Sequence, residues 1–328
     1  MEPLIVDPAE AGTKLLRFLE KHLAGSDVSP AVLHRWVRTG QVRRNGGRAQ
    51  PFARLEAGDR IRIPPFALPE APGSSRAENP PAAAPRRGER LSPLLRVHAV
   101  TPDILVLEKS AGLPSQPGSG HTVSVVSLLR ERFAALPFIP APAHRLDKAT
   151  SGLVLAGRTH EAQRFLHEAL ASGPNRGKGA TKEYLAWCSG IWPKQKTTTL
   201  RDMLVKETEE DGRERMRLTG SSESESKGKE ALCRVTPLQL ATSPKAPASL
   251  LLITLETGRS HQIRVQLAGR GHPIIGDGKY GGRPFPLLLL HAFRVGLPAR
   301  PGQEEQVFVA PPDWPEPFAV HRALKREH

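Results

Sequence analysis

The chain has 328 residues, of which 38% are hydrophobic and 24% charged. This balance is typical of a globular protein, and the length allows two domains. Lys and Arg number 47 against 33 Asp and Glu, which gives a net charge of +14. Such an excess favours a polyanionic partner: RNA, DNA or, least of the three, an anionic membrane.

Three further features narrow the class of protein. No apolar run approaches the ~18 residues needed to cross a bilayer, so we expect no membrane span. The opening Met1-Glu2-Pro3 lacks the basic and apolar regions of a signal peptide. Cys188 and Cys233 have no metal-ligand spacing and are too few for a disulfide framework. We therefore predict a cytoplasmic protein with reduced thiols and without a metal.

The first 66 residues have the pattern of a small separate unit. Leucines from Leu15 to Leu23 predict one amphipathic helix, and the apolar residues between Val32 and Val37 predict a second. Gly40 ends the second helix, Asn45-Gly46 marks a hairpin turn, and a strand follows at 60–63. Between positions 14 and 62 there are eleven Lys and Arg against four Asp and Glu.

This order of elements resembles the S4 RNA-binding module. Leu16 departs from it, because that module more often has an acidic residue there. The resemblance implies that RNA contacts come from the second helix and the hairpin. The residues at those positions are Arg35, Arg38, Arg43, Arg44 and Asn45.

Two segments are predicted to lie outside the packed cores. Residues 67–92 are rich in Pro, Ala, Ser and Arg and have the composition of a flexible linker. Residues 206–229 are strongly polar and predict a surface loop within the larger domain. The larger domain, residues 93–328, alternates apolar strand-like segments with few helices, such as the one expected at 160–170. This pattern predicts an α+β fold around a mixed or antiparallel sheet.

Polar clusters stand next to three of these segments. Arg145 and Asp147, two residues apart in an extended chain, point to the same face and either pair together or face a ligand. Ser260 is placed to cap a helix, which would set His261 and Arg264 one turn apart beside a site for a phosphate or carboxylate. Taken singly, each cluster is more often structural: an internal ion pair, a capped helix with surface cations, or a core tyrosine at Tyr184.

In chain order the clusters resemble the RluA-type family of pseudouridine synthases, over most of residues 96–315. The matching segments are Lys109-Ser110-Ala111-Gly112-Leu113-Pro114, His144-Arg145-Leu146-Asp147 with Thr150-Ser151-Gly152, Lys182-Glu183-Tyr184, and 257–264 with 271–277. Ser110 and Gln266 depart from the usual pattern at positions without a catalytic role. The related RsuA type also has an S4 module, but His261-Gln262 favours the RluA type.

The resemblance implies a role for each matched residue. Asp147 would be the catalytic carboxylate, Tyr184 would stack on the flipped uracil and assist proton abstraction at C5, and Arg264 would form a buried ion pair with Asp147. Arg145 would occupy the place of the flipped base. Further substrate contacts are expected from His144, Arg259 and His261. It stays open whether Asp147 attacks C1′ or C6 or promotes a glycal.

The sequence therefore predicts an RNA pseudouridine synthase, acting as a monomer on structured RNA and in particular on ribosomal RNA. Isomerisation of uridine exchanges a C–N for a C–C bond without net redox change, so we expect no cofactor. The alternative is a noncatalytic RNA-binding or ribosome-assembly protein on the same fold.

Overall fold

The structure is a computed structural model. It describes residues 3–23, 28, 30–50, 53–64, 84–117, 123–136, 138–174, 179–208, 214–219, 228–241 and 246–320. The chain divides into two compact units, Met1–Pro80 and Pro81–His328. No helix in the described part of the chain is long and apolar enough to cross a membrane.

The first unit packs two helices, α1 (Leu15–His22) and α2 (Pro30–Arg38), on a small sheet. The strands of this sheet lie in the order β1 (Leu4–Ile5), β4 (Arg60–Arg62), β2 (Arg43–Arg44) and β3 (Gly47–Arg48), and a short 3₁₀ helix spans Pro8–Glu10. Asn45 and Gly46 have φ values of 50° and 81°, the left-handed pair that a two-residue hairpin turn requires. The helices and the hairpin thus form where the sequence predicts them, while the likeness to an S4 module stays a prediction.

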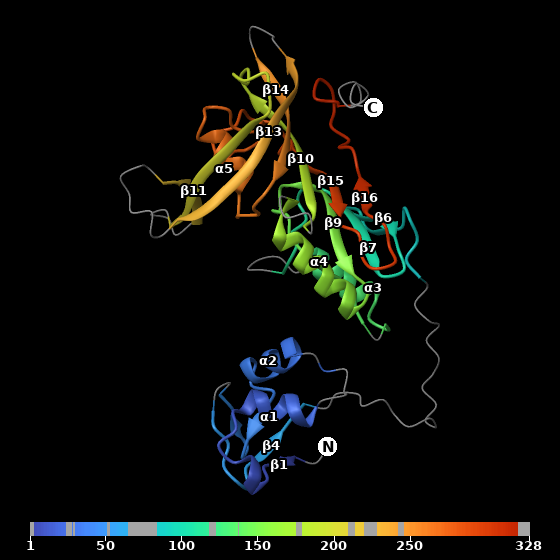
Figure 1. The fold of residues 1–328 in the computed structure, drawn as a ribbon, viewed down its shortest axis with the longest axis vertical. Helices are drawn as coiled ribbons and strands as arrows, with labels where there is room; N and C mark the ends of the chain where they lie inside the picture. Colours follow the sequence, from blue (N-terminus) through green and yellow to red (C-terminus); the bar gives the residue numbers. More distant parts are fainter. Residues whose placement is uncertain are drawn as a thin grey trace. The chain divides into compact units, whose positions relative to one another are not determined.

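One large sheet organises the second unit (Figure 1). The described residues contribute twelve strands to it, and all their pairings are antiparallel except that between β15 and β9. The main path runs β12 (Glu214–Leu218), β11 (Thr198–Thr208), β13 (Lys229–Ala241), β14 (Ala248–Leu255), β10 (Thr181–Ser189), β15 (Leu290–Leu297), β9 (Ser151–Gly157), β7 (Ile104–Lys109), β6 (Leu95–Val100) and β5 (Arg90–Ser92). β8 (Ala141–Pro142) pairs with β9, and β16 (Gln306–Val309) with β15. The predicted α+β class with a mixed, mostly antiparallel sheet is confirmed.

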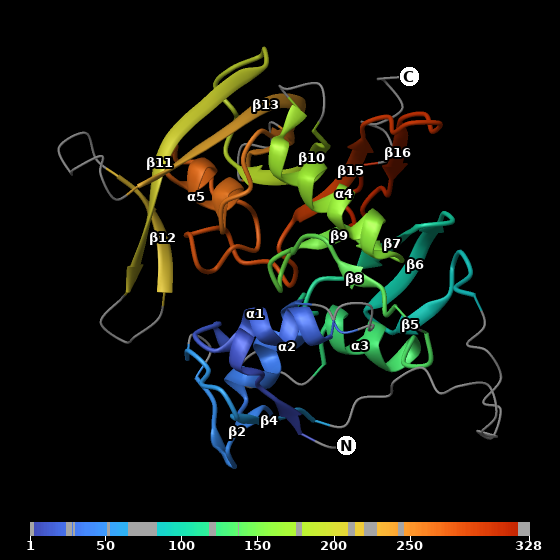
Figure 2. The same cartoon turned by 60° about the horizontal axis from the view of Figure 1, so that its bottom comes forward.

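Helices cover parts of this sheet (Figure 2). They are α3 (Val125–Arg132), α4 (His160–Ser172) and the short α5 (Gln262–Ala268). Alternate residues of β7 and β9 enter two different cores: Val106 and Leu155 pack with α4, while Leu107 and Val154 join the core that also holds α3. Burial on both faces explains why these strands are continuous apolar segments.

The one parallel pairing brings the two halves of the sheet together and depends on a glycine. Ser151 and Gly152 of β9 pair with His291 and Ala292 of β15. Gly152 has a φ of +115°, and a Cβ there would lie 2.3 Å from the carbonyl oxygen of Ala292. Any other residue would therefore push the strands apart. This seam directly follows the loop that contains Asp147.

Two sequence predictions about irregular segments are wrong in part. Residues 206–229 are not simply a surface loop, because β11 continues to Thr208 and β12 pairs with it, Leu204 opposite Leu218. Polar composition concealed the alternation of Met216 and Leu218 with charged residues, which is the period of a half-buried strand. Residues 90–92 belong to β5 rather than to a linker. Linker residues 67–83 and loop residues 209–213 and 220–227 lie outside the described residues.

Candidate active site

A cleft with a cavity volume of about 90 Å³ gathers most of the expected site residues. Arg145, Asp147, Tyr184, Arg259, His261 and Arg264 all line it, although they come from three separate stretches of chain. The three clusters that each admitted a structural role therefore meet in one place.

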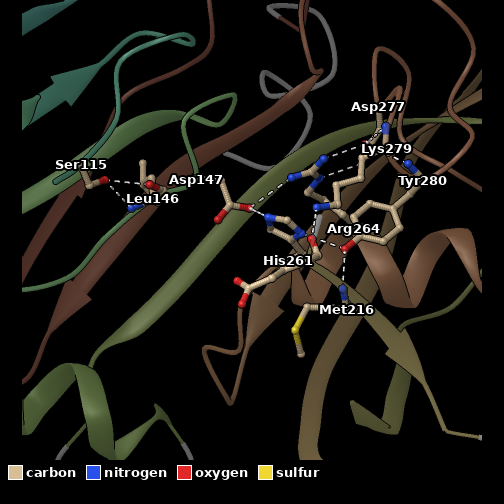
Figure 3. A network of polar contacts seen from close by, with 10 residues as sticks. Ser115, Leu146, Asp147, Met216, His261, Arg264, Asp277, Lys279 and Tyr280 are labelled. Atoms are coloured by element: carbon tan, nitrogen blue, oxygen red, sulfur yellow. Dashed lines mark hydrogen bonds and ion pairs between the residues drawn. The ribbon is translucent and has the colours of Figure 1, made fainter. Parts of the chain in front are cut away.

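The loop before β9 fixes the position of Asp147 through its backbone. Ser115 Oγ donates to the carbonyl oxygen of Leu146 (2.7 Å) and accepts from the Leu146 N–H (3.0 Å) (Figure 3). On the other side of Asp147, the Lys148 carbonyl accepts from the Gly112 N–H (2.8 Å) and from Lys109 Nζ (3.2 Å). The backbone is thus held firmly, while the Asp147 side chain stays 25% exposed to the cleft.

Lys109 is a component of this support that the sequence did not reveal. Its side chain is fully buried, and Nζ also donates to the carbonyl oxygens of Leu113 (2.8 Å) and Ser110 (3.1 Å). Burial lowers the pKa of Lys109 to about 7, although the negative charge of Asp147 opposes this shift. The segment 109–114 therefore holds the Asp147 loop through hydrogen bonds to its backbone.

Arg264 is bound mainly to a carboxylate other than the predicted one. Its Nε lies 2.8 Å from Asp277 Oδ2 and its Nη2 lies 2.8 Å from Asp277 Oδ1, whereas Nη1 lies 3.5 Å from Asp147 Oδ2. The predicted contact with Asp147 is present but long, and the tight bidentate pair is with Asp277, whose side chain is 0% exposed. Arg264 stands between the two carboxylates (Figure 3).

The turn before α5 differs from the expected one. Gln262 Oε1 accepts from Thr257 Oγ1 (2.8 Å) and from the Arg259 N–H (3.0 Å). Because these bonds close the turn, the helix begins only at Gln262, and Ser260 does not cap it as predicted. His261 occupies the N-cap position in the left-handed conformation, with a φ of 53°.

Tyr184 lies on β10 between β14 and β15, opposite Ile253 and Ala292. It is 9% exposed and lines the cleft beside Asp147. Burial, with a further contribution from the charge of Asp147, raises the pKa of Tyr184 well above its usual value. Its hydroxyl is therefore protonated at neutral pH.

Three of the expected substrate contacts differ in their surroundings. Arg145 is exposed on the cleft, and within the described ranges no acidic side chain pairs with it. Arg259 also lines the cleft, with Nε bound to the carbonyl oxygen of Glu230 (2.9 Å). His144 does not line the cleft. Its Nε2 accepts the N–H of Leu155 (3.0 Å), and burial lowers its pKa to about 4.

The five residues expected to bind RNA in the first unit fall into two groups. Arg44 Nε lies 2.6 Å from Asp59 Oδ2, and Asn45 donates to Asp59 Oδ1 (2.7 Å) and accepts from the Arg60 N–H (2.8 Å). These two side chains hold the hairpin together. Arg35, Arg38 and Arg43 are exposed. No group of acidic, His and Cys side chains suited to a metal ion occurs in the described part of the chain.

Comparison with known proteins identifies the family. The pattern of the RNA pseudouridylate synthase family matches residues 103–269. The ribosomal large subunit pseudouridine synthase C of Salmonella typhimurium is 34% identical over 291 residues, which cover 86% of this chain and 81% of that protein. The chain belongs to the RNA pseudouridylate synthase family. The enzyme of the same name from Haemophilus influenzae is 30% identical over 302 residues, or 89% of this chain and 85% of that one.

Solved structures agree with this assignment. Human RNA pseudouridylate synthase domain containing 1 superposes with a TM-score of 0.55 at 25% identity, over 72% of this chain and 88% of that one. Human RNA pseudouridylate synthase domain containing 4 shares the fold, with a TM-score of 0.52 at 22% identity, over 70% of this chain and 92% of the other. The family predicted from the four motifs is confirmed. The chain is an RNA pseudouridine synthase, and no finding supports the noncatalytic alternative.

Proposed function

We propose that this enzyme isomerises uridine in the RNA of the large ribosomal subunit, with Asp147 as the catalytic carboxylate. The substrate class follows from the names of the relatives, which are ribosomal large subunit pseudouridine synthases. The observation that carries the catalytic role is the position of Asp147, the one acidic side chain lining the described cleft, next to Arg264. We further propose that the enzyme works in the cytoplasm as a monomer.

The reaction defines what the cleft must supply. The N1–C1′ bond of uridine breaks, the base turns, and a C5–C1′ bond forms. C5 then loses its proton and N1 gains one, so electrons balance without an oxidant or reductant. An ionised carboxylate can act on the sugar or the base as a nucleophile, or stabilise positive charge that develops on the ribose. Asp147 is suited to this because it is half-buried and faces a guanidinium.

Arg264 holds that carboxylate in place. Its guanidinium faces Asp147, with Nη1 3.5 Å from Oδ2. Because Asp277 holds Arg264 through two bonds of 2.8 Å, Nη1 stays directed toward Asp147 without moving closer. We therefore assign Arg264 and Asp277 as the support that positions the reactive carboxylate.

Tyr184 and Arg145 would receive the extruded nucleotide. A uridine inside an RNA helix has to leave the stack, and an aromatic face offsets part of the cost of unstacking. Tyr184 offers such a face on the cleft. As a protonated phenol it can donate a hydrogen bond but cannot itself remove the C5 proton, so the Asp147 carboxylate is the base at hand. Arg145 is exposed at the cleft. It is available to contact the phosphate backbone or to fill the place that the extruded base leaves in the RNA helix.

Labelling of pseudouridine with carbodiimide tests the proposal directly. Large-subunit ribosomal RNA transcribed in vitro would be incubated with the purified enzyme, labelled and read by primer extension. We expect new stops at defined uridines, absent without enzyme. If small-subunit or transfer RNA were modified and large-subunit RNA were not, the substrate class would be wrong. Loss of the same stops in RNA from cells lacking the gene would confirm the target.

A further inference from the structure

His261 lies between the catalytic carboxylate and a buried hydroxyl (Figure 3). Its Nδ1 lies 2.8 Å from Tyr280 Oη, and its Nε2 lies 3.7 Å from Asp147 Oδ2. The two rings meet edge to face, with centroids 5.6 Å apart at 83°. The imidazole therefore offers one nitrogen to each of two groups, and the proton it carries in the neutral form has to be on one of them.

The second partner of Tyr280 decides which nitrogen carries it. The backbone N–H of Met216, on β12, donates to Tyr280 Oη at 3.2 Å. A backbone N–H can only donate, so the phenol oxygen is an acceptor in that bond. Among the described residues, His261 Nδ1 is the one acceptor within hydrogen-bond distance of Oη, so we infer that the O–H is donated to it. Nδ1 is then the acceptor. The imidazole proton consequently resides on Nε2, the nitrogen that faces Asp147.

Tyr280 is itself held in place by the support already described. Asp277 Oδ1, which binds Arg264, also accepts the backbone N–H groups of Lys279 (3.2 Å) and Tyr280 (3.3 Å). The guanidinium carbons of Arg264 and Arg215 lie 5.1 Å and 5.0 Å from the centre of the Tyr280 ring. Lys279 Nζ donates to the carbonyl oxygen of Glu214, which ties the same loop to β12.

The charges around His261 favour its neutral form. Burial lowers the pKa of His261, and the positive charges of Arg264 and Lys279 act in the same direction, while Asp147 and Asp277 oppose them. A neutral imidazole with the opposite tautomer would point a lone pair at the Asp147 carboxylate, which is repulsive. The orientation of one phenol hydroxyl thus determines whether Asp147 faces a donor or an acceptor.

We propose that Tyr280 is a positioning residue for the isomerisation: by donating to His261 Nδ1 it keeps the Nε2–H of His261 directed at the Asp147 carboxylate. The inference rests on the proposed role of Asp147. Tyr280 does not line the cleft, so its effect on the reaction passes through His261. The N–H of Met216 donates to the same hydroxyl oxygen, so strand β12 is part of the same arrangement.

Tyr280→Phe is the first test, because it removes the hydroxyl and keeps the ring near the Arg264 and Arg215 guanidinium groups. At saturating RNA we expect the single-turnover rate to fall about tenfold, the upper end of what one lost hydrogen bond between neutral groups costs. The Kd for RNA should change less than twofold. The acid limb of the pH–rate profile should move to higher pH, because the Asp147 anion has lost stabilisation. Thr219→Val is the control. It removes a hydroxyl contact to the Met203 carbonyl between β12 and β11 and should leave both the rate and the pH–rate profile unchanged.

His261→Gln separates positioning from simple structural support. The amide NH₂ of glutamine can place a donor near the position of Nε2 without help from Tyr280. In this background, adding Tyr280→Phe should change the rate less than twofold and should not shift the pH profile. A tenfold loss in both backgrounds, or an unshifted profile in Tyr280→Phe, would overturn the proposal. An inactive wild-type enzyme would refute the proposed function instead, so the two failures are distinguishable.

Discussion

The two carboxylates that face Arg264 differ in how tightly the protein holds them. Asp277 is fully enclosed and makes two bonds of 2.8 Å to the guanidinium, whereas Asp147 is 25% exposed and has one contact at 3.5 Å. Asp277 also accepts two backbone N–H groups from its own loop. A fully satisfied carboxylate is a structural element, while an incompletely satisfied one beside a cleft is available for a substrate. The comparison indicates that Asp277 positions Arg264, and that Arg264 in turn faces Asp147.

The largest effect is expected from removing the charge of the exposed member. Asp147→Asn should abolish isomerisation. The melting temperature should equal that of the wild type, because the Asp147 side chain has few internal contacts, and the affinity for RNA should stay within a few-fold. Release of tritium from [5-³H]uridine RNA measures turnover, since C5 loses its hydrogen in the reaction. Turnover close to that of the wild type would remove Asp147 from the chemistry.

The enclosed member should respond in the opposite way. Asp277→Asn leaves Arg264 buried without its charged partner, which costs about 3–5 kcal/mol of folding free energy. Urea denaturation measures this, and turnover should fall only in part at temperatures where the variant stays folded. Arg264→Ala should be similarly unstable, because it leaves the Asp277 carboxylate buried without its guanidinium partner. A variant as stable as the wild type would show that the pair contributes little to the fold.

Tyr184 tests whether the cleft needs a hydroxyl or only a ring. Tyr184→Phe should bind RNA normally and lose turnover by at least about tenfold, the size expected when one hydrogen-bond donor to a charged group is removed. The measurement is a single-turnover rate at saturating RNA. Equal rates for the two proteins would restrict Tyr184 to stacking.

His144 extends the comparison to a residue that the sequence placed in the site and the structure does not. Its pKa of about 4 in the folded protein lies below the ~6.5 of an unfolded histidine. Between these values only the unfolded chain binds the proton, so stability is complete above pH 6.5 and is lost as pH falls toward 4. His144→Gln should reduce this slope by at most about 1.4 kcal/mol per pH unit without weakening RNA binding. An unchanged slope with weakened binding would restore His144 as a substrate contact.

The smallest effects are expected in the first unit. Arg38 is exposed, whereas Arg44 is paired with Asp59. Arg38→Gln should lower the slope of log Kd against log salt by about one unit, because one phosphate contact is lost. Arg44→Gln is the matched control: it should lower the melting temperature of this unit and leave the salt slope unchanged. If Arg44→Gln lowered the salt slope and Arg38→Gln did not, Arg44 rather than Arg38 would be the phosphate contact.

Much of this arrangement was accessible from the sequence, because motifs preserve which residue types face a cleft. Short patterns predict Asp147, Tyr184 and Arg264 as site residues, and the structure brings them together. The same patterns do not predict the tight partner of Arg264, although Asp277 belongs to the motif at 271–277. Which of two carboxylates a guanidinium binds more tightly depends on how the loop after Ile275 folds back, and local pattern does not contain that information.

Other errors have similar physical origins. Ser260 is a good capping residue by type, but the side chain of Gln262 closes the preceding turn and moves the helix start beyond it. Lys109 belongs to the first motif, but the sequence gives its side chain no role, because full burial of a lysine is rare. It is made possible here by three carbonyl oxygens that accept from Nζ. For β12, the alternation of Met216 and Leu218 with arginines was present in the sequence and could have revealed the strand.

The most direct test places the two carboxylates side by side. Single-turnover tritium release at saturating RNA and thermal unfolding would be measured on Asp147→Asn and Asp277→Asn under the same conditions. We predict that Asp147→Asn melts like the wild type and releases no tritium, and that Asp277→Asn melts at a lower temperature and releases some. Release by Asp147→Asn at the wild-type rate, or wild-type melting of Asp277→Asn, would contradict the division between a reactive and a supporting carboxylate.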